Sequence, residues 1–580
     1  MLASRSIKDL GRLGYALNRL AITSVRGNSE FTVARFEAQV PGKLLSRHIL
    51  RSGDEVEVIN MSQEIHIQGI RSMSLAGTVT KVTGAFVEVS LSKETNIPLT
   101  LKRSCALKVI ASDLPYRRML EAMQKLYVWP AARPTLHSVL FGSADPRFDS
   151  AAAISTFLDM SLNDEQKKAV NLAVTAQDIA LIHGPPGTGK TYTLVEVIRQ
   201  LVAQGKTLLV CGPSNISIDN IAERLKKASD IRFMRLGNAA KANPSMLKPN
   251  ITRLDILSRM HARVVLTTLC SSGGPKLSKL NIAFDVVIID EAAQAIEAEC
   301  WIAGIQAPKI ILAGDHHQLP PTLLSPQNQS IKRSANSAES VRDGDLFTKT
   351  MFERVHDKLG EAACQMLNIQ YRMHASIMHI SSKYLYNGNL VAHYSVEQHL
   401  LQDLPNISSN HITKCALMFI DTNRKHRETA DSKYQSHAKG RKQDKAPKSN
   451  YNSGEAKLAI KHAQELIQAG VDGKDIAIIS PYNGQVRLLK LMSKKVPGVQ
   501  IGSVDGFQGG EREAVILSLV RSNPQKIVGF LDDYRRINVA ITRARRHLCV
   551  IGDSHTISGG SKFLKQLLRH LQTEGTVRKL

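Results

Sequence analysis

One glycine-rich run constrains the fold more than any other part of the sequence. It reads Gly184-Pro185-Pro186-Gly187-Thr188-Gly189-Lys190-Thr191 and fits the pattern G-x-x-x-x-G-K-[ST]. An apolar segment at 179–182 precedes it with the length of a buried strand, and apolar residues at helical spacing follow it. Backbone N–H groups of such a loop, together with the helix N-terminus, hold phosphate oxygens. The run predicts a nucleoside triphosphate site where Lys190 reaches the β/γ-phosphates and Thr191 holds Mg²⁺.

Short apolar segments alternate with helical patterns through most of the remaining chain, which predicts parallel sheets of an α/β fold. A first set of buried strands is expected at 208–211, 264–267, 284–289 and 310–313. The alternation starts again after Asn368, with strands expected at 416–420, 476–479, 514–519 and 548–551. Two α/β units therefore follow one another, and a final helix with leucines at 564, 567, 568 and 571 closes the second.

The N-terminal part of the chain has a different pattern. Apolar residues alternate with polar ones around Val56 and Val87, and glycines punctuate the segment, which predicts a small β-barrel. A connecting helix is expected around 116–126 and a Pro- and Ser-containing stretch around 130–155. We expect four parts: a barrel accessory domain at 1–110, a helical connector at 111–155, and α/β units at 156–345 and 346–580.

The charge balance favours a polyanionic partner. Among 580 residues, 76 Lys and Arg outnumber 51 Asp and Glu, giving a net charge of +25 and a pI near 9.7. Nucleic acid is the partner such a balance favours, and a generally basic surface is the alternative. The polar run at 424–453, with nine basic and three acidic residues from 424 to 448, is either a surface loop or a nucleic-acid contact. No run of 18 apolar residues occurs, so no membrane-spanning segment is expected.

Cysteine usage points to a reducing compartment, the cytoplasm or the nucleus. The seven cysteines are scattered without a C-x-x-C pair, which argues against zinc and against disulfides. The first thirty residues are rich in Arg and Ser, so a mitochondrial presequence is an alternative reading of that segment. Their apolar residues run on into the expected barrel, which argues against it.

Chemistry is expected at the ends of the apolar strands. Asp290 and Glu291 follow the segment 286–289, where Asp290 suits Mg²⁺ and Glu291 suits the attacking water. Gln318, in Gly314-Asp315-His316-His317-Gln318, could sense the γ-phosphate or position water, because an amide both donates and accepts. We expect His316 and His317 to be exposed and to have no catalytic role.

Positive charge is also needed where the γ-phosphoryl oxygens gain charge in the transition state. Two arginines of the second α/β unit are candidates, Arg372 in Gln370-Tyr371-Arg372-Met373-His374 and Arg543 in Ile541-Thr542-Arg543-Ala544-Arg545. An arginine that the second unit supplies to the γ-phosphate, called an arginine finger, would couple ATP hydrolysis to closure of the cleft between the units.

Taken together, these motifs resemble those of superfamily 1 helicases of the up-frameshift branch. Within that branch the sequence is most similar to the immunoglobulin mu-binding protein 2 helicases, as the segments 213–220 and 503–553 indicate. The resemblance runs from about residue 50 to the end. The matching pieces are Leu162-Asn163-x-x-Gln166, the glycine-rich run, 290–294, 314–321, 370–374, 504–509 and 535–545.

The resemblance implies two RecA-like P-loop domains that clamp ATP and Mg²⁺, with the small barrel reaching over nucleic acid. It implies ATP-driven 5′→3′ movement on single-stranded RNA or DNA by a monomer, with a ribosome or ribonucleoprotein as a further partner. In this family pattern Gln166 reads adenine, Tyr371 stacks on it and Glu511 contacts the ribose. Contacts to the single strand are implied at strand ends, where short polar side chains suit sequence-blind binding of phosphates, namely at Pro213, Ser214, Asn215, Thr267, Thr268, Pro481, Tyr482, Asn483, Ser503, Val504 and Asp505.

The sequence departs from the family pattern in three ways. Gly510 stands where the family usually carries Arg, and the segment 243–261 is short where the family has a long helical insertion. We also expect the chain to lack the additional nucleic-acid-binding and zinc modules of the longest relatives. The shortened segment favours an ATP-gated RNA clamp that unwinds little, whereas the full set of hydrolytic residues favours a motor. A metabolic P-loop kinase explains neither the second α/β unit nor the charge.

Overall fold

The computed structural model describes most of the chain. It covers residues 6–580 except 28–30, 47, 49, 51–53, 62–74, 93–96, 98–103, 111–112, 133, 229, 238–262, 323–348, 431–448 and 508. The shortened segment at 243–261, Gln508 and most of the basic run at 424–453 lie outside the described residues. The two described ends of that run form a two-stranded ribbon of β17 (Thr429–Ala430) and β18 (Asn450–Tyr451).

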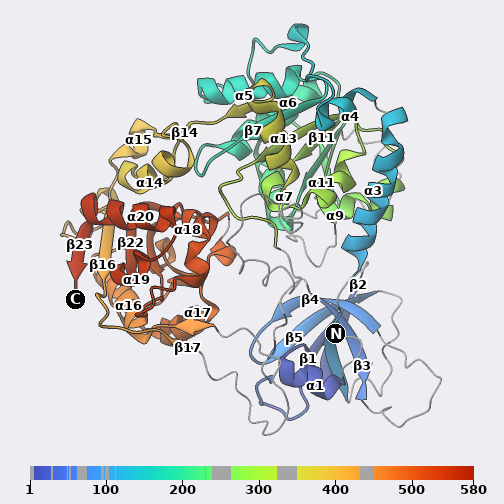
Figure 1. Cartoon of the computed structure of the whole chain (residues 1–580). Coiled ribbons are helices and arrows are strands. Elements are labelled where there is room, and N and C mark those ends of the chain that lie inside the picture. Colours follow the sequence, from blue (N-terminus) through green and yellow to red (C-terminus); the bar gives the residue numbers. More distant parts are fainter. Residues whose placement is uncertain are drawn as a thin grey trace.

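The N-terminal part forms the expected closed barrel, with strand order β1-β2-β5-β4-β3-β6 (Figure 1). All neighbouring strands pair antiparallel. Alternation places Val56, Val58, Val87 and Val89 inside the barrel, where they are fully buried. A short helix, α1 (Ile7–Leu13), packs beside β1. The strands are β1 Ala16–Gly27, β2 Phe31–Ala38, β3 Glu55–Asn60, β4 Leu75–Val82, β5 Phe86–Ser92 and β6 Cys105–Val109.

Two helices lead from the barrel to the rest of the chain. α3 (Leu114–Ala132) contains the helix expected around 116–126, and α4 (Pro134–Phe141) lies in the Pro- and Ser-containing stretch that follows. Met119, Met123 and Leu126 recur on one face of α3 and pack against the core of the first sheet, beside α11 (Glu297–Gly304). The connector is therefore attached to the first α/β unit by an amphipathic helix.

The first sheet contains seven parallel strands in the order β13-β7-β12-β11-β8-β10-β9. Helices α5 (Asp164–Thr175), α6 (Lys190–Ala203) and α7 (Asn215–Ala228) pack on one face, and α3, α4, α11 and α13 (Met351–Leu359) on the other. Both faces are covered, which explains the continuous apolar runs in the sequence. The strands are β7 Ile179–His183, β8 Leu208–Gly212, β9 Phe233–Arg235, β10 Val264–Thr268, β11 Val286–Ile289, β12 Lys309–Gly314 and β13 Cys364–Met366.

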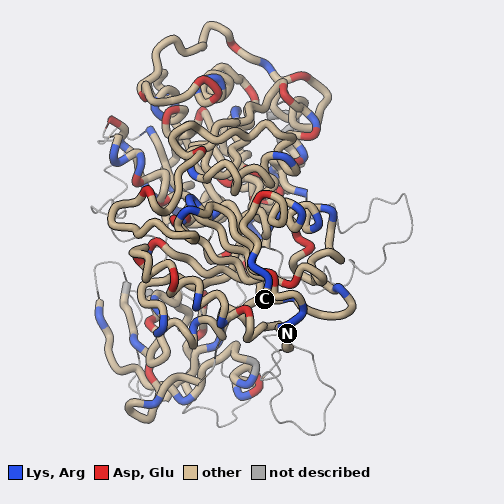
Figure 2. Tube along the Cα trace, turned by 90° about the vertical axis from the view of Figure 1, so that its left-hand side faces the viewer, with Lys and Arg blue, Asp and Glu red and all other residues tan. Residues whose placement is uncertain are grey.

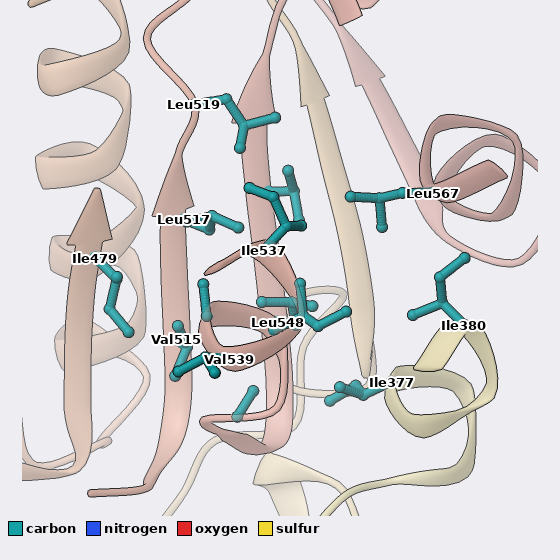
Figure 3. Packing of buried hydrophobic residues seen from close by; sticks show 14 of the residues in the cluster. Ile377, Ile380, Ile479, Val515, Leu517, Leu519, Ile537, Val539, Leu548 and Leu567 are labelled. Atoms are coloured by element: carbon teal, nitrogen blue, oxygen red, sulfur yellow. The ribbon is translucent and has the colours of Figure 1, made fainter. Parts of the chain in front are cut away.

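The second sheet has six parallel strands in the order β20-β19-β21-β22-β16-β23. Helices α14 (Ala375–Leu385), α18 (Tyr534–Ile541) and α20 (Lys562–Thr573) cover one face, where Val515, Leu517 and Leu548 meet Ile377 and Ile537 (Figure 3). α16 (Ser453–Gln468) and α17 (Asn483–Met492) cover the other. The strands are β16 Leu417–Asp421, β19 Ile476–Ser480, β20 Gln500–Ser503, β21 Arg512–Ser518, β22 Ala544–Gly552 and β23 Thr576–Lys579.

Two details differ from the sequence expectation. β13 pairs with β7, so the first sheet takes its last strand from residues beyond the boundary expected at 345/346. The chain also continues past α20 into β23, which adds an edge strand beside β16. Both strands are short and partly exposed, which leaves little apolar pattern for sequence reasoning to detect.

Among the described residues, Lys and Arg are spread over the barrel and both α/β units (Figure 2). No helix among the described residues is long and apolar enough to cross a membrane.

Candidate nucleotide and nucleic-acid site

Parallel strand order brings the predicted motifs to one edge of the first sheet. β7, β12 and β11 are neighbours, so the glycine-rich run after β7 lies beside Asp315 and Gln318 after β12 and beside Asp290 and Glu291 after β11. Because the carboxyl ends of parallel strands meet at the same edge, ligands of such sheets bind there. The second unit contributes Arg372, Glu511 and Arg543 from the opposite side.

These residues line a single cleft of ≈ 840 Å³. The structure brings together every residue that the sequence predicts for nucleotide binding and hydrolysis. They are Gln166, Gly184, Pro185, Pro186, Gly187, Thr188, Gly189, Lys190, Thr191, Asp290, Glu291, Gln318, Tyr371, Arg372, Glu511 and Arg543.

The glycines of the loop are required by its backbone. Gly187 and Gly189 both adopt a φ of 80°, a left-handed conformation that side chains disfavour. A Cβ on Gly187 would also lie 2.7 Å from Arg372 Cβ, and the Tyr371 N–H donates to the Gly187 carbonyl at 2.9 Å. The second unit therefore approaches the phosphate loop so closely that only glycine fits between them.

Lys190 is the first residue of α6 and is held by two acids. Its Nζ lies 2.6 Å from Asp290 Oδ1 and 2.7 Å from Glu291 Oε1. Burial alone would lower the pKa of Lys190, but the two carboxylates raise it above its usual value. Burial raises the pKa of Glu291, which suits a group that must accept a proton or polarise water. The Thr191 hydroxyl and the Asp290 carboxylate offer the hard oxygen ligands that Mg²⁺ prefers.

The two candidate arginine fingers are held differently. Arg372 pairs through Nε with Glu511, so part of its charge is already neutralised. Arg543 is buried and bonds only main-chain carbonyls and a hydroxyl, with its Nε donating to the Val539 carbonyl at 2.9 Å. Burial, with Arg372 nearby, lowers the pKa of Arg543 to about 9. Of the two candidate fingers, Arg543 is thus the one that has no bonded carboxylate among the described residues.

The residues expected at the adenine are tied to one another. Gln166 caps α5 together with Asn163, and its Nε2 donates to the Thr188 carbonyl of the loop at 3.0 Å. Asn163 Nδ2 donates to the Tyr371 hydroxyl at 2.9 Å. This end of the cleft therefore connects the first turn of α5, the phosphate loop and the segment after β14 (Ile369–Gln370).

The expectation that His316 and His317 are exposed is wrong. Both rings pack in a cluster with His183, Phe352 and Tyr386. Burial lowers the pKa of His316 to about 3 and that of His317 to about 4, so both are neutral at pH 7. The residues that follow β12 are polar, and their sequence alone does not distinguish a segment packed against helices from one exposed to solvent.

The same cluster contains a possible set of metal ligands, His183, Asp315 and His316, whose ligating atoms lie within 4.8 Å of one another. The Asp315 carboxylate, however, already interacts with four hydrogen-bonding partners, from His183, His317, Gln318 and Tyr386. A carboxylate has about four lone-pair sites, so its capacity is filled by the protein itself. The cluster is a hydrogen-bonding network.

The residues expected to contact a single strand lie at the carboxyl ends of β8, β10, β19 and β20. The side chains of Ser214, Asn483 and Asp505 are exposed, and those of Pro213, Asn215, Thr268, Pro481 and Ser503 are partly exposed. Those of Thr267, Tyr482 and Val504 are buried, and the Tyr482 hydroxyl donates to the Val528 carbonyl. The buried three can support the neighbouring loops, while the others can reach a ligand.

Several residues of the cleft were missed by the sequence analysis. Tyr192 follows the loop, and the face of α7 turned to the cleft carries Ser217, Asn220, Arg224 and Lys227. The Arg224 guanidinium stacks on the Tyr192 ring at 3.9 Å. The positions 217, 220, 224 and 227 follow helical spacing after β8, a signal that could have identified this face.

Comparison with known proteins gives the family. Two sequence families, both described as AAA domain, match residues 161–261 and 255–326 and residues 347–555. DNA-binding protein SMUBP-2 of Mesocricetus auratus is 36% identical over 99% of this chain and 61% of its own length, so the chain spans about three fifths of that relative. DNA polymerase alpha-associated DNA helicase A of Schizosaccharomyces pombe is 35% identical over 98% of this chain and 91% of its own length. An uncharacterized ATP-dependent helicase of Methanocaldococcus jannaschii is 29% identical over 91% of this chain and 86% of its own length. These matches confirm the resemblance seen in the sequence: the chain belongs to the family that includes SMUBP-2 and DNA polymerase alpha-associated DNA helicase A.

Proposed function

We propose that this chain is an ATP-dependent nucleic-acid helicase or translocase of superfamily 1 that moves 5′→3′ on single-stranded RNA or DNA. One observation carries the proposal: residues of both α/β units line the same nucleotide cleft. A ligand that contacts both sides stabilises the closed arrangement by its difference in affinity for the closed and open states. Binding and hydrolysis of ATP would thereby open and close the cleft, as a motor requires.

Each group in the cleft has a role that follows from its position. The loop N–H groups and Lys190 bind the phosphates, and Thr191 and Asp290 would hold Mg²⁺, which neutralises charge on the phosphate oxygens. Glu291 and Gln318 orient the attacking water. Arg543, from the second unit, stabilises the charge that develops on the γ-phosphoryl group. Gln166, Tyr371 and Glu511 would select adenine and ribose.

The strand-end residues support a single-strand path along the carboxyl edges of both sheets. Ser214, Thr268, Asn483 and Ser503 are hydroxyl and amide groups, which bind phosphate without reading the base. Closure of the cleft would move the contacts on one unit relative to those on the other. That movement would convert ATP turnover into steps along the strand.

DNA is the first substrate to test, because the relatives are named as DNA-binding proteins and DNA helicases. RNA, and with it a ribosome or ribonucleoprotein partner, is the second. We propose that the chain acts as a monomer in the nucleus or cytoplasm, where its seven free cysteines would stay reduced.

The test is ATP hydrolysis with and without single-stranded DNA or RNA, followed by displacement of a duplex with a 5′ overhang. Stimulated hydrolysis with displacement is the expected result, and a 3′-overhang duplex is the matched control that should stay paired. Stimulated hydrolysis without displacement would instead favour the ATP-gated clamp. A rate of ATP hydrolysis that neither DNA nor RNA changes would refute the proposal.

A further inference from the structure

Asp315 lies at the centre of a buried network behind the nucleotide cleft. It follows β12 and is 1% exposed. Its Oδ1 accepts from the His317 N–H and lies within hydrogen-bonding distance of His183 Nε2, both at 3.1 Å. Its Oδ2 accepts from Gln318 Nε2 and from the Tyr386 hydroxyl, both at 2.8 Å. One carboxylate oxygen therefore holds a cleft residue of the first unit and a tyrosine of the second.

The charges fix the direction of these hydrogen bonds. Burial alone would raise the pKa of Asp315, but its hydrogen bonds and its neighbours His183 and His317 hold it well below its usual range. Burial and the nearby Asp315 raise the pKa of Tyr386, so the phenol keeps its proton. Asp315 can then only accept, and Tyr386 must donate to it.

From Tyr386 the network continues into two helices of the second unit. Tyr386 follows the last turn of α14, and its oxygen accepts from Asn538 Nδ2 of α18 at 3.3 Å. Asn538 Nδ2 also donates to the His317 carbonyl at 2.8 Å, and its Oδ1 accepts from Ser381 Oγ at 2.8 Å. Tyr386, Asn538 and Ser381 are each at most 2% exposed, so water cannot easily replace these contacts.

This arrangement makes the orientation of Gln318 depend on the second unit. The Gln318 amide lines the cleft, and the Asp315 oxygen that holds it is shared with Tyr386. Separation of the units would remove the Tyr386 hydroxyl and leave that oxygen with one donor fewer. Asp315 Oδ1 would keep its contacts with His183 and His317, but Oδ2 and the Gln318 amide bonded to it would be held less tightly.

We propose that Tyr386 is a positioning residue for hydrolysis. Its hydroxyl fixes Asp315, and through Asp315 the amide of Gln318, only while α14 and α18 are docked against the end of β12. This rests on the proposed function and extends it by naming how docking of the second unit is communicated to the cleft.

The variant Tyr386→Phe tests this, because it keeps the ring, which packs 5.3 Å from His317, and removes only the hydroxyl. With saturating single-stranded nucleic acid, kcat for ATP hydrolysis should fall about tenfold, as loss of one hydrogen bond would give. KM for ATP should stay unchanged, because the phosphate loop is untouched. An unchanged kcat would overturn the inference.

Two further variants separate positioning from a purely structural effect. Ser382→Ala, in the last turn of α14, removes another buried hydroxyl, which donates to the Leu390 carbonyl at 2.7 Å, and it should keep the wild-type kcat. In a Gln318→Ala background, Tyr386→Phe should have no further effect on kcat, since it acts through Gln318. A full tenfold loss in both backgrounds would show that Tyr386 acts elsewhere and would overturn the inference.

Wild-type protein without strand-stimulated hydrolysis would refute the proposed function and this inference together. A wild-type response to the strand that Tyr386→Phe retains in full would refute the inference alone.

Discussion

Lys190 shows how one side chain serves both the fold and the site. Lys190→Ala should lower ATP hydrolysis at least about 100-fold, because a preorganised donor to the phosphates is lost. The variant also leaves the buried Asp290 and the partly exposed Glu291 without their cation, and Glu291 should then take up a proton because its pKa is already raised. Steady-state hydrolysis with a single strand present measures the loss. Lys168→Ala, which removes an exposed pair with Glu165 on α5, is the matched control. Normal turnover by a folded Lys190→Ala variant would contradict the nucleotide assignment.

Arg543 is predicted to act in hydrolysis and not in nucleotide binding. Arg543→Ala should lower kcat by about 10³–10⁵, the usual contribution of an arginine finger, while the affinity for ATP is kept. Arg543→Lys should not restore the rate, because an ammonium lacks the planar fork. Arg546→Ala, in strand β22 three residues after Arg543 and paired with Glu513, is the control with near-normal turnover. Binding of a fluorescent ATP analogue and single-turnover hydrolysis separate the two effects. A variant that loses binding together with hydrolysis would assign Arg543 to the phosphates of the ground state.

At the scale of single residues, the sequence placed the motif residues in the cleft but missed the face of α7 and did not show how the cleft residues are paired. A motif such as G-x-x-x-x-G-K-[ST] carries its geometry in its spacing, so Lys190 and Thr191 could be placed from sequence. The contact between Tyr386 and Asp315 joins residues that are 71 positions apart and belong to different α/β units, and no local sequence pattern predicts it. The partial burial of His316 and His317 has the same origin, since it depends on contacts with helices from later in the chain.

Among the elements, α16 is joined to the end of β21 by a buried carboxyl. Glu455 Oε2 accepts from Ser518 Oγ and from the Val520 N–H, both at 2.8 Å. Val520 has a φ of 72°, a strained backbone for a β-branched residue, and the Arg521 N–H closes a tight turn onto the Leu519 carbonyl. The carboxyl thus holds a strained turn at the end of the strand.

Burial raises the pKa of Glu455 to about 8, which predicts a pH-dependent stability. The ordinary pKa of a Glu side chain is about 4.3, so the unfolded chain loses this proton near that pH. The folded chain keeps the proton up to about pH 8 and therefore binds more protons between the two values. The free energy of unfolding should therefore fall as pH rises through this window, by at most about 1.4 kcal/mol per pH unit. Glu455→Gln stays neutral and should lose this contribution. Urea midpoints of both proteins at several pH values measure it, and parallel curves would contradict the prediction.

The sheets themselves were predictable to a large extent. Strands buried on both faces, such as β11 and β12, are continuous apolar runs and were expected within a few residues. Edge strands such as β13 and β23 are short and partly exposed, so their sequences resemble loops. What places them in the sheets is pairing with a strand far away in the chain, which local pattern does not contain.

At the scale of the whole molecule, both the net charge of +25 and the neutral strand-end residues are expected to contribute to the affinity for nucleic acid. Counterion release makes log K fall with log salt in proportion to the phosphates neutralised by Lys and Arg, with a slope of about −0.7 per contact on single strands. Ser214 and Asn483 are uncharged and cannot contribute to that slope. The double variant Ser214→Ala/Asn483→Ala should therefore weaken binding by a similar factor at every salt concentration and leave the slope unchanged.

Fluorescence anisotropy with a labelled single strand, from about 50 to about 200 mM salt, measures this. The wild type should show a steep negative slope, because Lys and Arg are spread over the barrel and both units (Figure 2). A parallel, lower line for the double variant would mean that neutral groups hold the phosphates in place while distributed charge supplies most of the affinity. A shallower slope for the variant would show that these loops position Lys or Arg side chains against the strand, so the division between neutral and charged contacts would be wrong.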